Sequence, residues 1–504
     1  MKILNTLIHK IMGSYVKHIL HYMEMPMPVQ ERLLTHLLKR AKGTTWGKQY
    51  DYHSIQNIET FQERVPVSTY EDLKPYVQQM MQGEANVLWP GKFSWFSKSS
   101  GTTNDKSKYI PVSKENLAQC HIKGPRDVMA IWYYSNPNTQ LFANGKGLVM
   151  GGTHQLIDAE KNIRAGDISG IMLQTMPFYA KYFHTPDVAT ALMPDWEAKI
   201  EKMVHQVIKE NVTNINGVPT WTMVLLKRIL EVTGKDNILE VFPDFEYYGH
   251  GGVSFEPYRE QFKRFFPAEH IQYRNMYNAS EGFFATQFAK EDDGMLLLLD
   301  NGIFYEFVPV EELKQEQPKA LTVEEVVLDT NYAMIISTNA GLWRYNTGDT
   351  VQFTSLYPHK IQITGRTKHF INVFGEEVMV ANTDKALAQT CMETDAKVCE
   401  YTVAPRYLSL EQKGRHEWAI EFEKAPLNLN TFAQLLDQNL QKLNSDYEAK
   451  RYKDIALENL VVHQVSRGTF HKWLRQKGKY GGQSKVPRLF NKRTYLDEIL
   501  KVLP

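Results

Sequence analysis

The spacing of apolar residues changes along this chain, and these changes constrain its fold more than any other feature. The first sixty residues show the spacing of amphipathic helices, with a clear stripe over Glu31–Leu38. From about residue 90, short apolar runs alternate with helical segments such as Trp196–Ile208. An extended run at Thr213–Asn216 precedes a helix that we expect to start at Pro219 and end at Gly234. This alternation predicts an α/β fold.

A second pattern begins at about residue 295, where strand-like runs follow one another without helices between them. The expected strands are Met295–Leu299, Ile303–Val308, Val323–Val327 and Ala333–Ser337. They predict a β-rich subdomain over about 295–366. Beyond it, the sequence predicts a smaller α+β unit, with helices near 383–393 and 430–444 and strands near 397–403, 417–423 and 459–466.

The chain has 504 residues, which is too many for one ordinary hydrophobic core. We expect a large N-terminal domain over residues 1–366 and a small C-terminal domain over 369–504. No Pro/Ser-rich tract, low-complexity segment or internal repeat lies between them. The boundary at 367–368 is therefore expected to be a hinge and not a flexible tether.

The net charge of the chain bears on its binding partners, and its cysteine content bears on the cellular compartment. A formal net charge of +1 gives no overall attraction to nucleic acid, so any anion site must be local. Three cysteines cannot form a disulfide framework, and this content fits a reducing, cytoplasmic environment.

The N-terminal segment is apolar in part and could be read as a targeting signal. Apolar residues at positions 3, 4, 7, 8, 11 and 12 follow helical spacing, but lysines and histidines interrupt every apolar run, so no signal-peptide core exists. No stretch approaches the ~20 apolar residues of a membrane span, so we expect no integral membrane association. We expect an amphipathic helix docked on the protein body, with contact to a membrane surface as the alternative.

A loop rich in small hydroxyl residues is the strongest indication of chemistry. Its residues are Ser99, Ser100, Gly101, Thr102 and Thr103, followed by Lys106 and Lys108. Backbone N–H groups and hydroxyls can donate to phosphate oxygens, while the lysines supply positive charge. The loop lacks the Walker A pattern, which disfavours a kinase or motor ATPase. A plain surface turn is the alternative.

Four further motifs follow in order, and with the loop they carry a family resemblance. They are Tyr277–Gly282, Leu342–Asp349, Gly365–Lys368 and Gln483–Arg488. The series resembles the adenylate-forming superfamily of acyl-CoA ligases, luciferases and peptide-synthetase adenylation domains. It is most similar to the acyl-acid amido synthetases, the Gretchen Hagen 3 (auxin-responsive) family. The resemblance spans roughly residues 60–490 and implies a large multi-subdomain N-terminal domain with a small mobile C-terminal domain.

This resemblance assigns ATP-binding roles. The loop residues Ser99, Ser100, Gly101, Thr102 and Thr103, together with Lys108, would hold the β- and γ-phosphates; Ala279 and Ser280 would line the nucleotide; Arg366 would contact ribose or phosphate. Tyr277 would stack on adenine, and Asp349 would accept hydrogen bonds from the ribose hydroxyls. The alternatives are a core tyrosine and a turn aspartate. Asp105 stands where the family usually has glycine, and its charge either points away from the phosphates or helps to hold a metal.

The resemblance also implies three residues with roles in the reaction cycle. Glu281 would contact Mg²⁺, which takes one or two carboxylates plus phosphate oxygens; a helix-capping glutamate is the alternative. Lys485, in a glycine-containing loop, would bridge the carboxylate and the α-phosphate while charge develops. Lys368 would be the pivot about which the small domain rotates. For Lys485 the alternative is an ordinary solvated lysine.

Three residues are expected beside the acid substrate: His154, Val218 and Trp221. A buried histidine satisfied by its neighbours is an equal alternative for His154. The chain has no Gly-x-Ser-x-Gly elbow and no catalytic-cysteine motif, which disfavours covalent hydrolase chemistry.

The predicted function is that of an ATP- and Mg²⁺-dependent ligase. A carboxylic acid would be converted to an acyl-AMP with release of pyrophosphate, and an amine, expected to be an amino acid, would then displace AMP to form an amide. Coenzyme A as the acceptor, giving an acyl-CoA ligase, is one alternative. A nucleotide-binding protein without catalysis is another.

Overall fold

The computed structural model of the chain divides into two compact units. The first comprises Met1–Gly252 and Phe265–Gln362, and the second comprises Val253–Arg264 and Ile363–Pro504. The structure describes residues 2–99, 108–252, 255, 258–290, 292–315, 318–366, 370–371, 378–406, 414–444, 447–448, 451, 457–478 and 485–502. Within these ranges, no helix is both long enough and apolar enough to cross a membrane.

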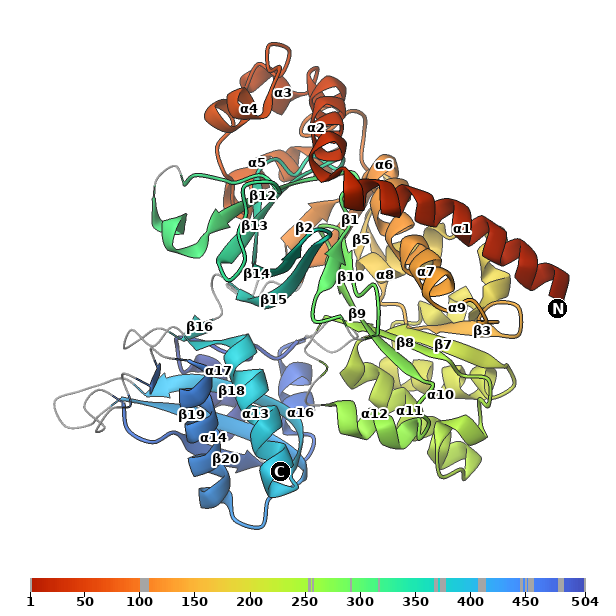
Figure 1. Cartoon of the computed structure of the whole chain (residues 1–504), viewed down its shortest axis with the longest axis vertical. Coiled ribbons are helices and arrows are strands. Elements are labelled where there is room, and N and C mark those ends of the chain that lie inside the picture. The colour runs from red at the N-terminus through yellow and green to blue at the C-terminus, as the bar shows by residue number, and fades with distance from the viewer. Residues whose placement is uncertain are drawn as a thin grey trace. The chain divides into compact units, whose positions relative to one another are not determined.

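The first unit begins with helices, as the spacing of the first sixty residues predicts. They are α1 (Lys2–Glu24), α2 (Pro26–Ala41), α3 (Thr45–Gln49), α4 (Ile58–Arg64) and α5 (Tyr70–Met81). Polar side chains cap two of them: Thr44 accepts from the N–H of Gly47, and Asn57 accepts from that of Thr60. α1 packs along α7 (Lys123–Ser135), so the expected docking of the N-terminal helix is confirmed (Figure 1).

An eleven-stranded mixed sheet forms the centre of the first unit, in the order β12-β13-β14-β15-β11-β10-β9-β8-β7-β3-β6. Its parallel part consists of β3 (Lys146–Val149), β6 (His184–Thr185), β7 (Val212–Gly217), β8 (Tyr247–Gly251) and β9 (Gln272–Asn278). Helices α10 (Trp196–Val207) and α11 (Pro219–Thr233) connect β6 to β7 and β7 to β8. α11 starts at Pro219, and Gly234 ends it with φ of 67°, both as predicted. The predicted α/β fold is confirmed.

The antiparallel part of this sheet contains β10 (Phe283–Thr286), β11 (Met295–Leu297), β12 (Ile303–Pro309), β13 (Asn331–Thr338), β14 (Tyr345–Leu356) and β15 (His359–Arg366). Three of the four predicted strands are present, but the prediction for Val323–Val327 is wrong. This segment forms turns, in which the Glu325 carboxylate accepts hydrogen bonds from the N–H and hydroxyl of Thr322 at 2.8 and 3.0 Å. Val323 and Val326 are buried, so the apolar run reflects core contacts and not a strand.

A smaller sheet carries the ends of the hydroxyl-rich loop. Its order is β2-β1-β5-β4, with β1 (Trp95–Ser99), β2 (Lys108–Pro111), β4 (His154–Asp158) and β5 (Ile163–Gly166). β1 and β2 are antiparallel, and Ser99 lies opposite Lys108. The two ends of the loop are therefore held by strand pairing. The remaining helical segments of this unit are α6 (Lys114–Asn116), the π-helix η1 (Leu117–His121), α8 (Ile168–Thr175), η2 (Phe178–Phe183), α9 (Val188–Ala191), η3 (Ile238–Glu240) and η5 (Val310–Lys314).

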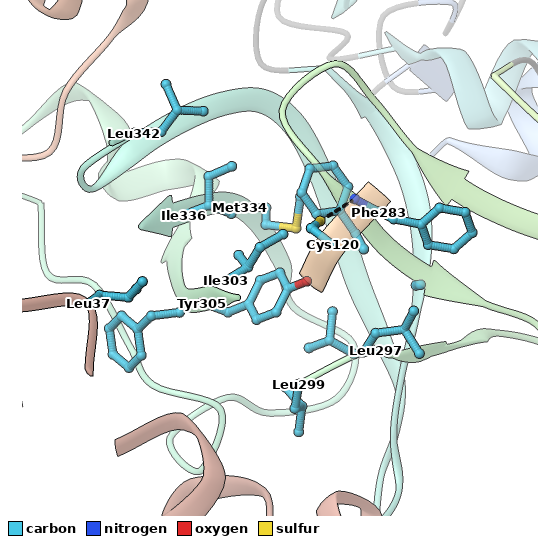
Figure 2. Close-up of a cluster of buried hydrophobic side chains, with 14 of the residues drawn as sticks. Leu37, Cys120, Phe283, Leu297, Leu299, Ile303, Tyr305, Met334, Ile336 and Leu342 are labelled. Atoms are coloured by element: carbon cyan, nitrogen blue, oxygen red, sulfur yellow. Dashed lines mark hydrogen bonds between the residues drawn. The ribbon is translucent and has the colours of Figure 1, made fainter. Parts of the chain in front are cut away.

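A buried cluster beneath β10 ties several of these elements together (Figure 2). The Cys120 sulfur, on η1, accepts a hydrogen bond from the backbone N–H of Phe283 at 3.2 Å. Ile303, Tyr305 and Met334 surround this pair (Figure 2). Burial raises the pKa of the Cys120 thiol to about 12, so the thiol is protonated at neutral pH. Cys120 is therefore a structural residue and not a nucleophile.

The second unit has the predicted α+β composition. Its elements are α12 (Arg259–Phe265), β16 (Phe370–Ile371), β17 (Val378–Met379), α13 (Val380–Thr394), β18 (Lys397–Arg406), β19 (Arg415–Lys424), α14 (Leu429–Leu443), β20 (Val461–Val465), α16 (Thr469–Gln476) and α17 (Thr494–Leu500). The last residue of α12, Phe265, belongs to the first unit. β19 pairs antiparallel with β18 and parallel with β20. All five predicted elements are present. The inclusion of Val253–Arg264 in this unit has no counterpart in the sequence pattern.

A buried ion pair holds the segment Leu342–Tyr345 in place. The Arg344 guanidinium contacts the Glu306 carboxylate at 2.9 Å, and the side chains are 5% and 0% exposed. The same guanidinium donates to the carbonyls of Gln62 and Val65 at 2.8 and 2.6 Å. Arg344 thereby joins α4 to β12 and β14, and every hydrogen-bonding group of the pair meets a partner that offsets its burial.

We expect Arg344→Met to lower the free energy of unfolding by about 3–5 kcal/mol, because it leaves the Glu306 charge buried without its cation. Adding Glu306→Gln to this variant should recover part of the loss. Denaturant unfolding measures both effects. Arg228→Met is the matched control: Arg228 also pairs with two glutamates, but its side chain is 38% exposed, so the loss should be far smaller. Equal losses for both arginines would contradict the structural role of the buried pair.

Candidate functional site

The carboxyl ends of the parallel strands β3, β7, β8 and β9 meet at one edge of the large sheet. Their register pairs Val149 with Asn216, Gly217 with His250, and Gly251 with Met276. Predicted site residues follow three of these strands: His154 after β3, Val218 and Trp221 after β7, and Ala279–Glu281 after β9. Ligands of α/β sheets bind outside the carboxyl ends of the strands. The fold therefore brings these residues to the edge at which a ligand site is expected.

A tight hairpin connects β9 to β10 and carries Ser280 and Glu281. The N–H of Ala279 donates to the carbonyl of Gly282 at 2.8 Å, which closes the turn. Both Ser280 and Glu281 are buried. Glu281 lies in a β-hairpin, so the alternative of a helix-capping glutamate is wrong. The bond between Phe283 and Cys120 anchors the hairpin from below, which fixes where the Glu281 backbone lies.

Tyr277 and Asp349 are in direct contact. The Tyr277 hydroxyl donates to Oδ2 of Asp349 at 2.6 Å, and both side chains are buried. These residues lie on β9 and β14, which are four strand spacings apart in the sheet order. In a flat sheet that separation would be about 19 Å, at about 4.8 Å per strand. The sheet must curl strongly between β9 and β14 to bring the two side chains together.

Asp349 lies within β14, next to an irregularity in the pairing of this strand. The pairing of β13 with β14 shifts register between Ala333 and Ile335, and the extra residues on β14 form a bulge. Gly348 in this bulge has φ of 80°, which only glycine adopts without strain. The Asn346 side-chain oxygen accepts from the N–H of Gly348 at 2.9 Å, and Thr347 donates to the carbonyl of Met334 at 3.0 Å. The bulge thus gives the Asp349 carboxylate a defined orientation.

Only the ends of the hydroxyl-rich loop are described. Ser100, Gly101, Thr102, Thr103 and Asp105 lie outside the described residues, and of Ser99 only the backbone is described. The Lys108 ammonium lies 3.5 Å from the Tyr345 hydroxyl and 5.5 Å from the centre of the Tyr70 ring. Tyr345 lies four residues before Asp349 on β14. The contact of Lys108 with Tyr345 therefore links the end of the loop to β14.

The predicted acid-pocket residues belong to different elements. His154, on β4, lies edge-on to the Trp95 ring with centres 5.2 Å apart. Val218 is the N-cap residue of α11, and Trp221 lies in its first turn and is buried. His250 is buried on β8, and among the described residues no group of three or more His, Cys, Asp or Glu side chains is placed to hold a metal ion.

Two charged side chains whose role the sequence did not reveal, Lys199 and Asp167, hold the segment before His154. The Lys199 ammonium, on α10, donates to the carbonyl of Gly151, and the Asp167 carboxylate accepts from the N–H of Thr153 at 3.0 Å. A Cβ at Gly152 would lie 1.9 Å from an Asp167 oxygen, so this segment requires glycine. Burial raises the pKa of Asp167 to about 6 and lowers that of Lys199 to about 8, so both are charged at neutral pH.

The second unit holds Lys485 at the start of an anchored segment. Lys485 is exposed, whereas the residues after it pair with β18: the N–H of Val403 donates to the carbonyl of Arg488 at 2.8 Å. The Arg488 side chain forms an ion pair with Glu400, donates to the Tyr258 hydroxyl at 3.0 Å and stacks on the Tyr401 ring. Burial raises the pKa of Glu400 to about 6.

These contacts fix the backbone three residues after Lys485. Neither Glu400 nor Tyr258 belongs to a motif, so only the structure reveals their role. The side chain of Arg366 and all of Lys368 lie outside the described residues.

Comparison with known proteins identifies the family of this chain. The GH3 family N-terminal, central and C-terminal domains match residues 15–271, 296–366 and 381–494. The indole-3-acetic acid-amido synthetase GH3.3 of Arabidopsis thaliana is 22% identical, with 91% of this chain and 89% of that protein covered. The jasmonoyl-L-amino acid synthetase JAR4 of Nicotiana attenuata is 23% identical, with 91% and 90% covered.

Two solved structures share the fold. The GH3.15 acyl acid amido synthetase has a TM-score of 0.78 at 16% identity, covering 95% of this chain and 94% of that one. The 2-hydroxyisobutyryl-CoA ligase in complex with 2-HIB-AMP has a TM-score of 0.61 at 12% identity, covering 94% and 90%. The predicted adenylate-forming fold is thereby confirmed. Since the N-terminal family domain alone matches more than half of the sequence, the chain belongs to the GH3 family.

Proposed function

We propose that this protein is an acyl-acid amido synthetase that activates a carboxylic acid with ATP and joins it to an amino acid. Family membership and the names of the relatives, which include an indole-3-acetic acid-amido synthetase and a jasmonoyl-L-amino acid synthetase, support the reaction class. The observation that carries the proposal is the hydrogen bond from Tyr277 to Asp349 at the curled edge of the sheet, on the strand that leads into the Glu281 hairpin. The protein acts in the cytoplasm.

The residues at this edge suit an adenine nucleotide. The Asp349 carboxylate accepts from the ribose hydroxyls, and Tyr277 holds it in position by occupying one of its oxygens. Tyr277 presents its ring to the adenine, and Ala279 and Ser280 lie beside it. Ser99–Thr103 and Lys108 surround the β- and γ-phosphates. Arg366 reaches the ribose or the phosphates.

Activation requires two anions to approach each other. The acid carboxylate attacks the α-phosphorus, an acyl phosphoanhydride forms, and pyrophosphate leaves. Lys485 places its ammonium between carboxylate and α-phosphate, where negative charge develops in the transition state. Mg²⁺, when bound, adds positive charge at Glu281 and the phosphates. In the second step the amine nitrogen attacks the acyl carbon, and AMP leaves with the electron pair of the broken C–O bond.

Lys368 is the pivot of the rotation that separates these two steps. The Arg488–Glu400 pair holds the segment that follows Lys485, so the backbone near this lysine moves with the second unit. The acid lies between His154, Val218 and Trp221. Lys199 and Asp167 support one side of this pocket by holding Gly151 and Thr153.

Coenzyme A is the alternative acceptor, because a CoA ligase shares the fold. A panel of carboxylic acids with ATP and Mg²⁺, trapped with hydroxylamine, identifies the acid. AMP release is then measured with the identified acid and either amino acids or coenzyme A. We expect amino acids, and not coenzyme A, to accelerate AMP release. Absence of acid-dependent pyrophosphate exchange with every acid would contradict the whole proposal.

Replacing Lys485 tests the activation step. We expect Lys485→Ala to lower acid-dependent ATP–pyrophosphate exchange by about 10²–10³-fold, as for other preorganised groups that stabilise transition-state charge. The KM for ATP should change little, because the ammonium acts in the transition state. Lys472→Ala, which removes another exposed lysine of the second unit, should leave the exchange rate unchanged. A Lys485→Ala variant with normal exchange would remove this lysine from the mechanism.

Replacing Tyr277 tests the nucleotide site. Tyr277→Phe keeps the ring but removes the bond to Asp349, so we expect the KM for ATP to rise about 5- to 10-fold through loss of about 1 kcal/mol of orientation. Tyr52→Phe is the control, since the Tyr52 hydroxyl is buried and bonded to Trp46 but lies outside the proposed site. It should reduce stability and leave the KM unchanged. If both variants have the wild-type KM for ATP, the Asp349 carboxylate does not need the Tyr277 hydroxyl to orient it for ATP binding.

A further inference from the structure

Helix α1 has two apolar faces, and only one of them packs on the protein. Ile8, Val16, Ile19 and Tyr22 are buried. The other face consists of Ile3, Leu4, Leu7 and Ile11, which are 87%, 42%, 53% and 42% exposed. Spacings of three and four residues place these four side chains side by side on the helix surface. We refer to them as the exposed stripe.

Specific contacts fix the orientation of α1 on the first unit, and this orientation keeps the exposed stripe on the surface. The Asn5 side chain donates to the carbonyl of Thr139 at 3.2 Å, and the His9 ring contacts the same carbonyl at 3.3 Å. The His9 ring also lies edge-on to Tyr133 with centres 4.8 Å apart. Further along, the Arg126 guanidinium stacks on the Tyr15 ring at 4.1 Å. These contacts hold the stripe on the surface of the first unit, and contiguous apolar surface of this kind marks an interaction site.

The charges of α1 select the kind of partner. Lys2, Lys10 and Lys17 are its lysines, and the helix has no acidic residue before Glu24. Lys10 and Lys17 are exposed, and Lys10 lies one helical turn from Leu7. The whole chain has a net charge of only +1, so this positive charge is a local feature. An apolar stripe flanked by lysines complements a surface that is apolar inside and anionic at its boundary.

The length of the stripe argues against a membrane span and against a coiled coil. Residues 3–11 rise only about 12 Å along a helix, which is far shorter than a membrane span. A coiled coil with a second copy would need three to four heptads of apolar residues, and it would bring lysines of like charge together. The stripe also precedes residue 15, where the match to the GH3 N-terminal domain begins. The known family domains therefore do not account for it.

We propose that α1 docks this protein on an anionic lipid bilayer. The exposed stripe enters the boundary between headgroups and acyl chains, and Lys10 and Lys17 lie at the lipid phosphates. The helix lies in the plane of the surface, because its buried face, adjacent to the stripe, stays packed on α7. Docking requires no rearrangement of the first unit.

Vesicle flotation with the full-length chain tests this proposal. We expect the protein to float with vesicles of phosphatidylcholine plus phosphatidylglycerol, and to float far less with phosphatidylcholine alone or in high salt. Leu7→Glu/Ile11→Glu should reduce the bound fraction at least about tenfold, since two apolar side chains are lost from the lipid contact. Lys10→Glu/Lys17→Glu should reduce binding to anionic vesicles only.

The matched control is Met392→Glu/Leu427→Glu, which introduces the same charges at exposed apolar residues of the second unit and should bind like the wild type. Thermal unfolding confirms that each variant is folded. Two results would overturn the proposal: absence of wild-type binding to anionic vesicles, or binding that Leu7→Glu/Ile11→Glu leaves intact. A dimer in light scattering that this double variant converts to a monomer would assign the stripe to a second copy of the chain and would also overturn it.

Discussion

The hydrogen bond between Tyr277 and Asp349 connects the architecture of the first unit to its chemistry. It joins residues on β9 and β14, which lie four strand spacings apart, and it can form only because the sheet between them curls. The parallel strands place one partner at their carboxyl edge, and the bulge at Gly348 turns the other toward it. A buried carboxylate that accepts a hydrogen bond from a phenol is held in a defined orientation. An oriented acceptor of this kind suits the ribose hydroxyls of the proposed nucleotide.

In the second unit, too, polar contacts fix the position of a segment that carries a proposed reactive group. Arg488 packs against Glu400, Tyr258 and Tyr401, and its backbone pairs with β18. A lysine on a long flexible side chain costs rotamer entropy whenever it must act at one point. Fixing the backbone near Lys485 leaves only the side chain to be ordered. In both units, buried polar contacts behind the proposed reactive groups reduce the freedom that catalysis would otherwise have to remove.

Sequence periodicity predicted most of the helices and strands because their apolar residues face a single core. It failed at Val323–Val327, where buried valines lie in turns held by Glu325. The residue order and spacing of the motifs predicted the family and the positions of Tyr277, Glu281 and Asp349. Spacing could not reveal that Tyr277 and Asp349 touch, since the distance between motifs along the chain does not show how strongly a sheet curls. The burial of Lys199 could not be predicted for a related reason. This lysine lies in an amphipathic helix, where lysines are common on the exposed face, and only the fold shows that it is buried.

Trp343 and Arg344 maintain the fold, and related sequences would therefore keep them even after losing ligase activity. Trp343 is fully buried and donates to the carbonyl of Leu88, and Arg344 is paired with Glu306 in the core. These residues make the motif before Asp349 recognisable, yet they maintain the fold and touch none of the proposed reacting groups. A gene duplicate released from selection for ligase activity would keep them as long as it had to fold, while Glu281 and Lys485 drifted. Retention of this motif therefore records ancestry, whereas under the proposed function Glu281 and Lys485 would record present use.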